Sequence, residues 1–221
     1  MRVYKLMKQE HAFDNLRNRR LKISVLDDLN DPFELLGLAL KSREARRTFQ
    51  RFKREMSRNY GLLCFSKRWH NPVLWAHYGD KHYGICLGFD VPTNHLKKIN
   101  YCPGRLKIAF NNTEDPKCIN DASMQKLLFT KYEDWAYEEE YRVYTTLEEQ
   151  DAETGLFFKE FGPELQLKEV IVGPMCDVSY DAVSKTIDGL TEVSIIKSRL
   201  AFNSYRVVKN KKPGSVWRKN A

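Results

Sequence analysis

The stretch of sequence that decides the fold is WAYEEEYRVYTT, at residues 135–146, where aromatic and β-branched residues surround three consecutive glutamates. A run of like charges usually lies on a solvated helix face or in a disordered tail. Aromatic and β-branched residues instead favour a strand. The pattern therefore predicts one long strand that carries an acidic cluster.

Alternate residues of a strand share a face, so we expect Glu138, Glu140 and Arg142 to point the same way. Glu139 would then lie on the opposite face, beside Tyr141. Two carboxylates at positions i and i+2 are separated by roughly 6–7 Å, given a rise of about 3.3 Å per residue. The positive charge of Arg142 would keep one of these carboxylates ionised.

The acidic face allows several interpretations. The simplest is a solvated surface with an acid–base pair. A glycosidase would need two carboxylates across a bond, and the net positive charge of the chain does not favour it. A metal-dependent nuclease would need acids gathered around Mg²⁺ with a lysine nearby. A transferase that cleaves the N-glycosidic bond of a nucleotide would use one Glu to hold a ribose hydroxyl and to stabilise an oxocarbenium-like transition state.

Composition indicates a folded protein. The 221 residues are 42% hydrophobic and 30% charged, which is typical of a globular domain. No apolar run approaches the ~20 residues of a membrane span, and the first residues lack the apolar segment of a signal peptide. We therefore expect a cytoplasmic protein with no membrane contact.

The pattern around the acidic stretch alternates between short strands and helices without an internal repeat or a linker. The fold class predicted is a single α+β domain over residues 1–208, with a divided, mostly antiparallel β-sheet flanked by helices. Residues 209–221 are predicted to be a basic, flexible tail, and residues 103–120 a long surface loop. The predicted strands are 3–6, 21–25, 61–66, 84–89, 98–101, 135–147, 167–173, 193–199 and 204–208, and the predicted helices are 10–19, 31–58, 72–78, 122–132 and 180–190.

Positive charge is concentrated in one predicted helix. The chain carries 37 Lys and Arg against 29 Asp and Glu, a net charge of +8. Residues 41–58, which begin with Lys41 and end with Arg58, hold eight basic and two acidic residues. Apolar residues recur there at helical spacing, which predicts a buried stripe beneath a basic face: Ala45, Phe49, Phe52 and Met56. The basic face indicates either a solvated surface or contact with a nucleic acid.

Cysteine and histidine spacing gives no sign of a metal site. The cysteines at positions 64, 86, 102, 118 and 176 form no CxxC pair, and the histidines form no HExxH motif. His70, His77 and His82 lie close in sequence but have no acids or cysteines at metal-ligand spacing. We therefore predict no metal.

A set of short motifs makes the chain resemble a bacterial domain family of unknown function, from about residue 3 to residue 208. The motifs, in order, are Tyr4-Lys5-Leu6, Leu29-Asn-Asp-Pro-Phe-Glu34, Cys64-Phe-Ser66, Leu74-Trp-Ala-His-Tyr78, Gly84-Ile-Cys-Leu-Gly-Phe89, Trp135-x-Tyr-Glu-x-Glu-x-Arg142 and Val170-Ile-Val-Gly173.

That family in turn resembles, more remotely, the ADP-ribosyltransferase fold. In that fold a first strand supplies an Arg or His for NAD, a later strand carries a Ser-containing motif, and a further strand carries Glu-x-Glu. Carried over by order, the resemblance implies that Glu140 is the catalytic carboxylate and Glu138 its partner on the acceptor side. Ser66 would donate a hydrogen bond to Glu140 and orient it.

The resemblance also implies a set of binding residues around this pair. Tyr4 and Lys5 stand where the first strand of the transferases has Arg or His. Trp75 and Tyr78 would stack on nicotinamide or adenine, although residues at this spacing more often belong to a helix core. The full set of predicted substrate-binding residues is Tyr4, Lys5, Asn30, Asp31, Ser66, Trp75, Tyr78 and Arg142. Asn30 and Asp31 are also typical of the start of a helix, which would explain them without any role in binding.

The leading hypothesis is therefore an ADP-ribosyltransferase or NAD glycohydrolase that uses NAD as its substrate. The resemblance extends this hypothesis to a bacterial toxin or phage-defence effector that modifies a protein or a nucleic acid bound at residues 41–58. Two alternatives remain: a nucleic-acid-binding module without catalysis, and a metal-dependent nuclease.

Overall fold

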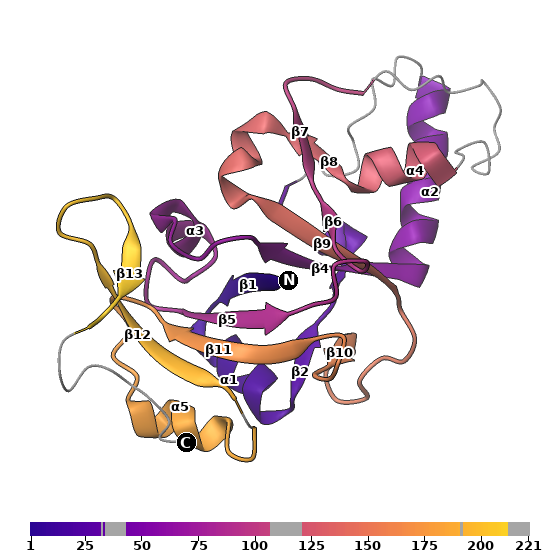
Figure 1. Ribbon diagram of the computed structural model, residues 1–221. Coiled ribbons are helices and arrows are strands. Elements are labelled where there is room, and N and C mark those ends of the chain that lie inside the picture. The colour runs from indigo at the N-terminus through magenta and orange to yellow at the C-terminus, as the bar shows by residue number, and fades with distance from the viewer. Residues whose placement is uncertain (32, 34–42, 107–120, 191, 212–221) are drawn as a thin grey trace.

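The computed structural model describes residues 1–31, 33, 43–106, 121–190 and 192–211 (Figure 1). The α-helices are α1 (Gln9–Arg17), α2 (Arg43–Asn59), α3 (Pro72–His77), α4 (Asp121–Leu128) and α5 (Tyr180–Thr186), and 3₁₀ turns occur at η1 (Leu26–Asp28) and η3 (Glu133–Glu138). The strands are β1 (Arg2–Met7), β2 (Arg20–Lys22), β3 (Ser24–Val25), β4 (Tyr60–Ser66), β5 (Ile85–Asp90), β6 (Lys97–Lys98), β7 (Asn100–Cys102), β8 (Thr130–Tyr132), β9 (Glu140–Thr146), β10 (Phe158–Glu160), β11 (Gln166–Val172), β12 (Ser194–Leu200) and β13 (Val207–Lys209). Within these residues no helix has the length and apolar character needed to cross a bilayer.

The main sheet has the order β13-β12-β11-β5-β1-β4-β9-β6, and β3 pairs with β4 beside this path. Adjacent strands of this sheet run antiparallel, except for β11 and β12, which run parallel to each other. Two short pairs, β2 with β10 and β7 with β8, lie outside it. The prediction of an α+β fold with a mostly antiparallel sheet flanked by helices is confirmed.

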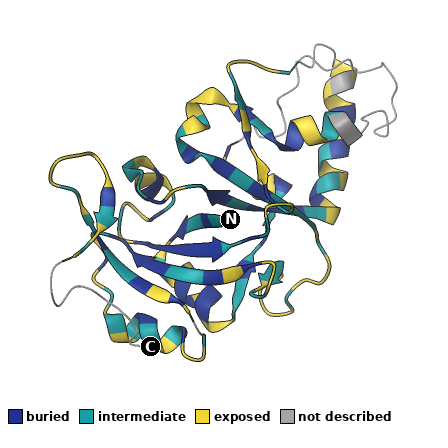
Figure 2. Ribbon diagram, viewed as in Figure 1, coloured by how far each residue is buried: buried dark blue, intermediate teal, exposed yellow. Residues whose placement is uncertain are grey.

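Helices cover both faces of the sheet because the central strands bury side chains on each side. Val170 of β11 packs in the core beneath α1 and α5, whereas Ile171, the next residue, packs beneath α3. Figure 2 shows β5 dark blue along most of its length, as expected for a strand buried on both faces. The strands β1 and β4, in the middle of the sheet, line a cavity.

The sheet divides between β1 and β4. β1 pairs with β5 over its whole length, and β4 pairs with β9 from Tyr60 to Ser66. Between them, β1 and β4 share the single register pair Tyr4 and Ser66. Because backbone hydrogen bonds hold adjacent strands about 4.8 Å apart, strands that pair at one point and then diverge leave room for side chains between them.

The basic helix α2 packs as its sequence pattern predicts. Phe49 and Phe52 are 1% and 9% exposed and contact a core that includes Leu62 of β4 and Leu127 of α4. Met56 completes the stripe as a partly buried residue. The side chain of Ala45 and the part of the predicted helix at residues 34–42 lie outside what the structure describes.

The acidic stretch differs from its prediction. Residues 135–146 do not form one strand: Glu133–Glu138 is the 3₁₀ turn η3, Glu139 has a left-handed backbone with φ 44°, and β9 begins at Glu140. The N–H of Glu139 donates to the carbonyl of Ala136 at 3.1 Å and closes this turn. Alternation along a strand therefore does not place Glu138 and Glu140 together; a turn places them together.

Two further elements differ from the sequence patterns. The predicted helix at residues 122–132 ends at Leu128, and Thr130–Tyr132 forms β8 because these β-branched and aromatic residues pair with β7. Strand β10, which pairs with β2, had no counterpart among the predicted strands. Most of the predicted surface loop, residues 107–120, and residues 212–221 of the predicted tail lie outside the described residues.

Candidate active site

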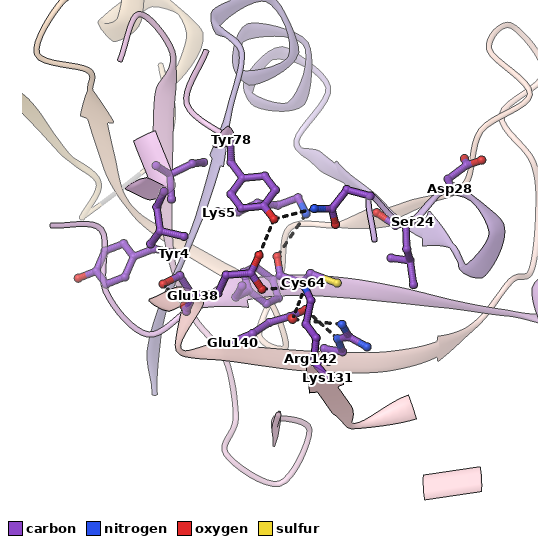
Figure 3. A pocket seen from close by; sticks show the side chains of 16 residues that line it. Tyr4, Lys5, Ser24, Asp28, Cys64, Tyr78, Lys131, Glu138, Glu140 and Arg142 are labelled. Atoms are coloured by element: carbon purple, nitrogen blue, oxygen red, sulfur yellow. Dashed lines mark hydrogen bonds and ion pairs between the residues drawn. The ribbon is translucent and has the colours of Figure 1, made fainter. Parts of the chain in front are cut away.

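A cavity of about 230 Å³ opens where β1 and β4 diverge. Its walls come from seven parts of the chain: β1, β4, β9, the segment around η1, α3, Glu138 of η3 and Lys131 of β8. Figure 3 shows that polar side chains from these elements converge on its centre. A concave site with a few convergent polar groups is the usual form of a small-molecule pocket.

Two glutamates share one lysine at this centre. Lys131 Nζ donates to Glu138 Oε2 at 2.8 Å and to Glu140 Oε2 at 3.4 Å. All three residues are buried, with exposed fractions of 6%, 5% and 4%. Buried charges of one sign need a compensating charge, and Lys131 supplies it for both carboxylates.

Arg142 holds Glu140 in a fixed orientation. Its Nε lies 2.7 Å from Glu140 Oε1 and its Nη2 lies 3.1 Å from Glu140 Oε2, which is the two-pronged geometry of a strong ion pair. The remaining Nη1 donates to the carbonyl of Leu128 at 2.8 Å. The backbone N–H of Glu140 donates to the hydroxyl of Tyr101 at 2.9 Å.

Glu138 is held by a tyrosine that also lines the cavity. The hydroxyl of Tyr78, from the end of α3, donates to Glu138 Oε1 (Figure 3). Asn30 Nδ2 donates to the same hydroxyl at 2.7 Å. Because the hydroxyl accepts a hydrogen bond from Asn30, its own proton is directed towards the carboxylate.

The two carboxylates have opposite pKa shifts. Burial raises the pKa of Glu138 above its ordinary value, and the positive charge of Lys131 only partly opposes this. Burial would also raise the pKa of Glu140, but the charge and hydrogen bonds of Arg142, followed by the charge of Lys131, lower it to about 2. The Cys64 thiol adds a hydrogen bond that lowers the pKa of Glu140 further. Two carboxylates with divergent pKa values can serve as a permanent anion and a group that exchanges a proton.

The first strand contributes a lysine. Lys5 Nζ donates to the carbonyl of Cys64 at 3.3 Å, across the division between β1 and β4. Burial lowers the pKa of this ammonium group. Tyr4 lines the same cavity, and its pKa is raised by burial and then by the charge of Glu169.

Eight of the ten predicted site residues line this cavity, and two do not. Those that do are Tyr4, Lys5, Asn30, Ser66, Tyr78, Glu138, Glu140 and Arg142. Trp75 is 0% exposed, and its indole N–H donates to the carbonyl of Trp69 at 2.6 Å within the core, so it cannot stack on a substrate. Asp31 is also buried and accepts a hydrogen bond from the N–H of Phe33 at 2.9 Å, beside a separate cavity.

Ser66 has a different role from the predicted one. Its hydroxyl donates to the backbone carbonyl of Glu138 at 2.6 Å and not to the carboxylate of Glu140. The N–H of Lys67 donates to the carbonyl of Glu139 at 3.0 Å beside it. Ser66 therefore fixes the turn that presents Glu138, because the left-handed residue Glu139 brings the backbone of η3 over the end of β4.

Three residues that contact the two glutamates were not predicted from the sequence as part of the site: Lys131, Tyr101 and Cys64. Lys131 lay inside a stretch predicted to be helical, and its aromatic and β-branched neighbours Thr130 and Tyr132 were the signal for a strand. A further signal was electrostatic, since two predicted buried carboxylates with one arginine leave a negative charge that needs a second cation.

Comparison with known proteins finds a family model that is similar to part of this chain. A family model described as "Protein of unknown function (DUF2971)" matches residues 74–143. The matched segment contains Tyr78, Lys131, Glu138, Glu140 and Arg142. No curated protein and no solved structure matches the chain. The predicted similarity to a family of unknown function is thus supported over these residues.

Proposed function

We propose that the cavity between β1 and β4 binds NAD or a related nucleotide and cleaves its N-glycosidic bond. The ADP-ribosyl group would pass to an acceptor or to water. The observation that carries this proposal is the pair of buried glutamates that share Lys131 and have opposite pKa shifts.

The strand arrangement supports the same proposal. The transferase resemblance requires the first strand, the Ser-motif strand and the Glu-motif strand to form one site. β1, β4 and β9 are neighbours in the sheet, and Tyr4 lies opposite Ser66, which in turn lies opposite Glu140. The three motifs therefore meet in one row across three strands that are far apart in sequence.

Glu140 suits the role of the permanent anion. With a pKa of about 2 it is ionised at neutral pH, and Arg142 holds both of its oxygens in place. When the bond between the ribose C1′ and the nicotinamide nitrogen breaks, its electron pair leaves with the nitrogen, and positive charge develops on the sugar. A fixed carboxylate stabilises that charge. A ribose hydroxyl would take the place of the Lys131 contact at 3.4 Å, which is the longest of the contacts to Glu140.

Glu138 suits the role of the proton acceptor. Its raised pKa makes it a better base than Glu140, and Tyr78 fixes the orientation of its carboxylate. The acceptor oxygen or nitrogen would add to C1′, and its proton would pass to Glu138. A base with a pKa shifted towards the working pH is the expected arrangement for such a step.

The dimensions of the cavity indicate which part of the nucleotide it holds. Its volume of about 230 Å³ is below the roughly 300–1,000 Å³ of pockets for drug-sized ligands. It can therefore enclose the ribose and base at the reacting end and not a complete dinucleotide. Lys5, on the first strand, lines the cavity and in its protonated form would pair with a phosphate of the nucleotide.

A metal-dependent nuclease has less support. Among the residues that the structure describes, no group of three His, Cys, Asp or Glu side chains could hold a metal ion. Glu138 and Glu140 instead both pair with Lys131, and Glu140 also pairs with Arg142.

The proposal is tested with purified protein and NAD labelled in the nicotinamide ring. We expect release of free nicotinamide and saturable NAD binding by calorimetry. Glu139→Gln is the matched control for variants of the site, because Glu139 is exposed and pairs with Arg68 at 3.2 Å on the protein surface. Absence of both binding and nicotinamide release from the folded protein would reject the proposed function.

A further inference from the structure

Helix α2 presents an unusually uniform arginine surface. Phe49 and Phe52 bury one side of the helix. Four arginines at spacings of four, three and four residues occupy the opposite side, and all are exposed; this arginine stripe consists of Arg47, Arg51, Arg54 and Arg58. At about 100° per residue, the four side chains lie within a sector of roughly 60°.

The stripe has the dimensions of a row of phosphate contacts. With a rise of about 1.5 Å per residue, its arginines are roughly 6, 4.5 and 6 Å apart along the helix, and its length is about 16 Å. Guanidinium groups bind phosphate oxygens through two parallel N–H donors. The surface therefore matches a polyanion with closely spaced phosphates.

The charged residues near the arginine stripe leave its arginines available to bind a ligand. Lys53, the other basic residue of the C-terminal half of α2, points inward and pairs with Asp27 at 3.4 Å. Glu44 and Glu55 lie along one flank of the stripe. Within residues 1–31, 33, 43–106, 121–190 and 192–211, no carboxylate forms an ion pair with any of the four arginines.

We propose that the arginine stripe binds the phosphate backbone of duplex DNA. Proteins that hold single strands combine a basic groove with aromatic residues on which bases stack, and the aromatic residues of α2, Phe49 and Phe52, are both buried. The major groove of B-form DNA admits a helix, whereas that of A-form RNA is too deep and narrow. Figure 1 shows α2 at the edge of the described part of the molecule.

Contacts within the fold connect this surface to the cavity. Ser57 Oγ accepts a hydrogen bond from the N–H of Asp27 at 3.0 Å, so α2 is attached to η1. The next residues along the chain, Asp28 and Asn30, line the cavity. That bound DNA is also the acceptor of the ADP-ribosyl group rests on the proposed function, whereas DNA binding itself does not.

The test compares two triple variants with equal charge. Arg47→Gln, Arg51→Gln and Arg58→Gln together remove three charges from the stripe and keep good helix formers at exposed positions. The control removes three exposed charges around α1 and α5, on the other side of the sheet: Lys8→Gln, Arg17→Gln and Lys185→Gln. Each variant lowers the net charge of +8 by the same amount.

Binding is measured by fluorescence anisotropy with a labelled duplex of about 20 base pairs at several salt concentrations. Four phosphate contacts predict a slope of about −3.6 for log affinity against log salt, or a roughly hundredfold loss between 50 and 200 mM salt. We expect the stripe variant to lose at least tenfold in affinity at low salt and most of this slope. The control variant should remain within threefold of the unmodified protein, with unfolding midpoints confirming that all proteins are folded.

Four outcomes would overturn the proposal. They are no measurable binding by the unmodified protein, an equal loss in both triple variants, an affinity that does not change with salt, and tighter binding to single strands, duplex RNA or heparin than to duplex DNA. Because the assay contains no NAD, any of these results leaves the nicotinamide-release experiment to decide the proposed function separately.

Discussion

Replacement of Glu140 by Gln should reduce both stability and activity. The amide keeps the shape of the side chain but removes the charge that pairs with Arg142, which is 1% exposed. A pKa of about 2, against an ordinary value of 4.5, corresponds to about 3 kcal/mol of stabilisation by the ionised form at neutral pH. Removing one partner of a buried ion pair typically costs roughly 3–5 kcal/mol, so the two values agree.

The expected change in thermal unfolding follows from this free energy. For a chain of this size, 1 kcal/mol shifts the midpoint by about 2–4 °C, so Glu140→Gln should lower the unfolding midpoint by about 6–12 °C. Glu139→Gln removes only a surface pair, with the Glu139 side chain 44% exposed. Such pairs contribute about 0–1 kcal/mol, so this control should shift the midpoint by at most about 4 °C.

The pH dependence has a defined sign. Because the pKa of Glu140 is depressed in the folded protein, its contribution is complete above the unfolded value of 4.5 and is lost as pH falls towards about 2. The difference in unfolding midpoint between the unmodified protein and Glu140→Gln should therefore be constant near neutral pH and narrow below about pH 4.5.

Activity is separated from stability by a double variant. Glu140→Leu with Arg142→Met removes both charges of the buried pair and should recover part of the stability lost in Glu140→Gln. Nicotinamide release should nevertheless stay at least a hundredfold below that of the unmodified protein, because the catalytic charge is absent. If Glu140→Gln kept near-normal turnover and an unchanged midpoint, both the stability argument and the assignment of Glu140 would be wrong.

Three further predictions concern neighbouring residues. Glu138→Gln should reduce transfer to an acceptor more strongly than hydrolysis of NAD, measured as the ratio of labelled acceptor to free nicotinamide, and an equal loss of both would contradict its role as the acceptor-side base. Tyr78→Phe removes a hydrogen bond that lowers the pKa of Glu138, so the acid limb of the pH–rate profile should move to higher pH, and a limb that stays in place or moves lower would exclude the link. Phe49→Ala should lower the free energy of unfolding in denaturant by about 3–5 kcal/mol, because Phe49 is 1% exposed on the buried side of α2. A decrease below about 1 kcal/mol would mean that the helix packs differently.

Sequence patterns were sufficient to predict those helices and strands whose own residues indicate which side is buried. The strands β1, β4, β5 and β11 were predicted because short apolar runs of strand length have few other solutions. The buried stripe of α2 followed from helical spacing for the same reason. The gathering of Glu138, Glu140 and Arg142 at one site was also predicted from the sequence, since residues so close along the chain remain close in almost any local structure.

Only the tertiary structure decided how these residues interact. The left-handed Glu139 turns the chain between the two carboxylates, and Ser66 and Lys67 of another segment hold that turn in place. Lys131 becomes the shared cation because β8 pairs with β7, a long-range contact that no local pattern encodes.

Trp75 is a second example of a residue whose surroundings the sequence could not predict. Its spacing from Tyr78 suits either a core or a binding surface, and the packing of α3 against Leu6 and Ile171 places the tryptophan in the core and the tyrosine at the cavity. The sequence by itself thus determined which residue types and short elements the chain contains. Tertiary packing determined which side chains face the cavity and with what charge, because burial and pKa depend on neighbours from distant parts of the chain.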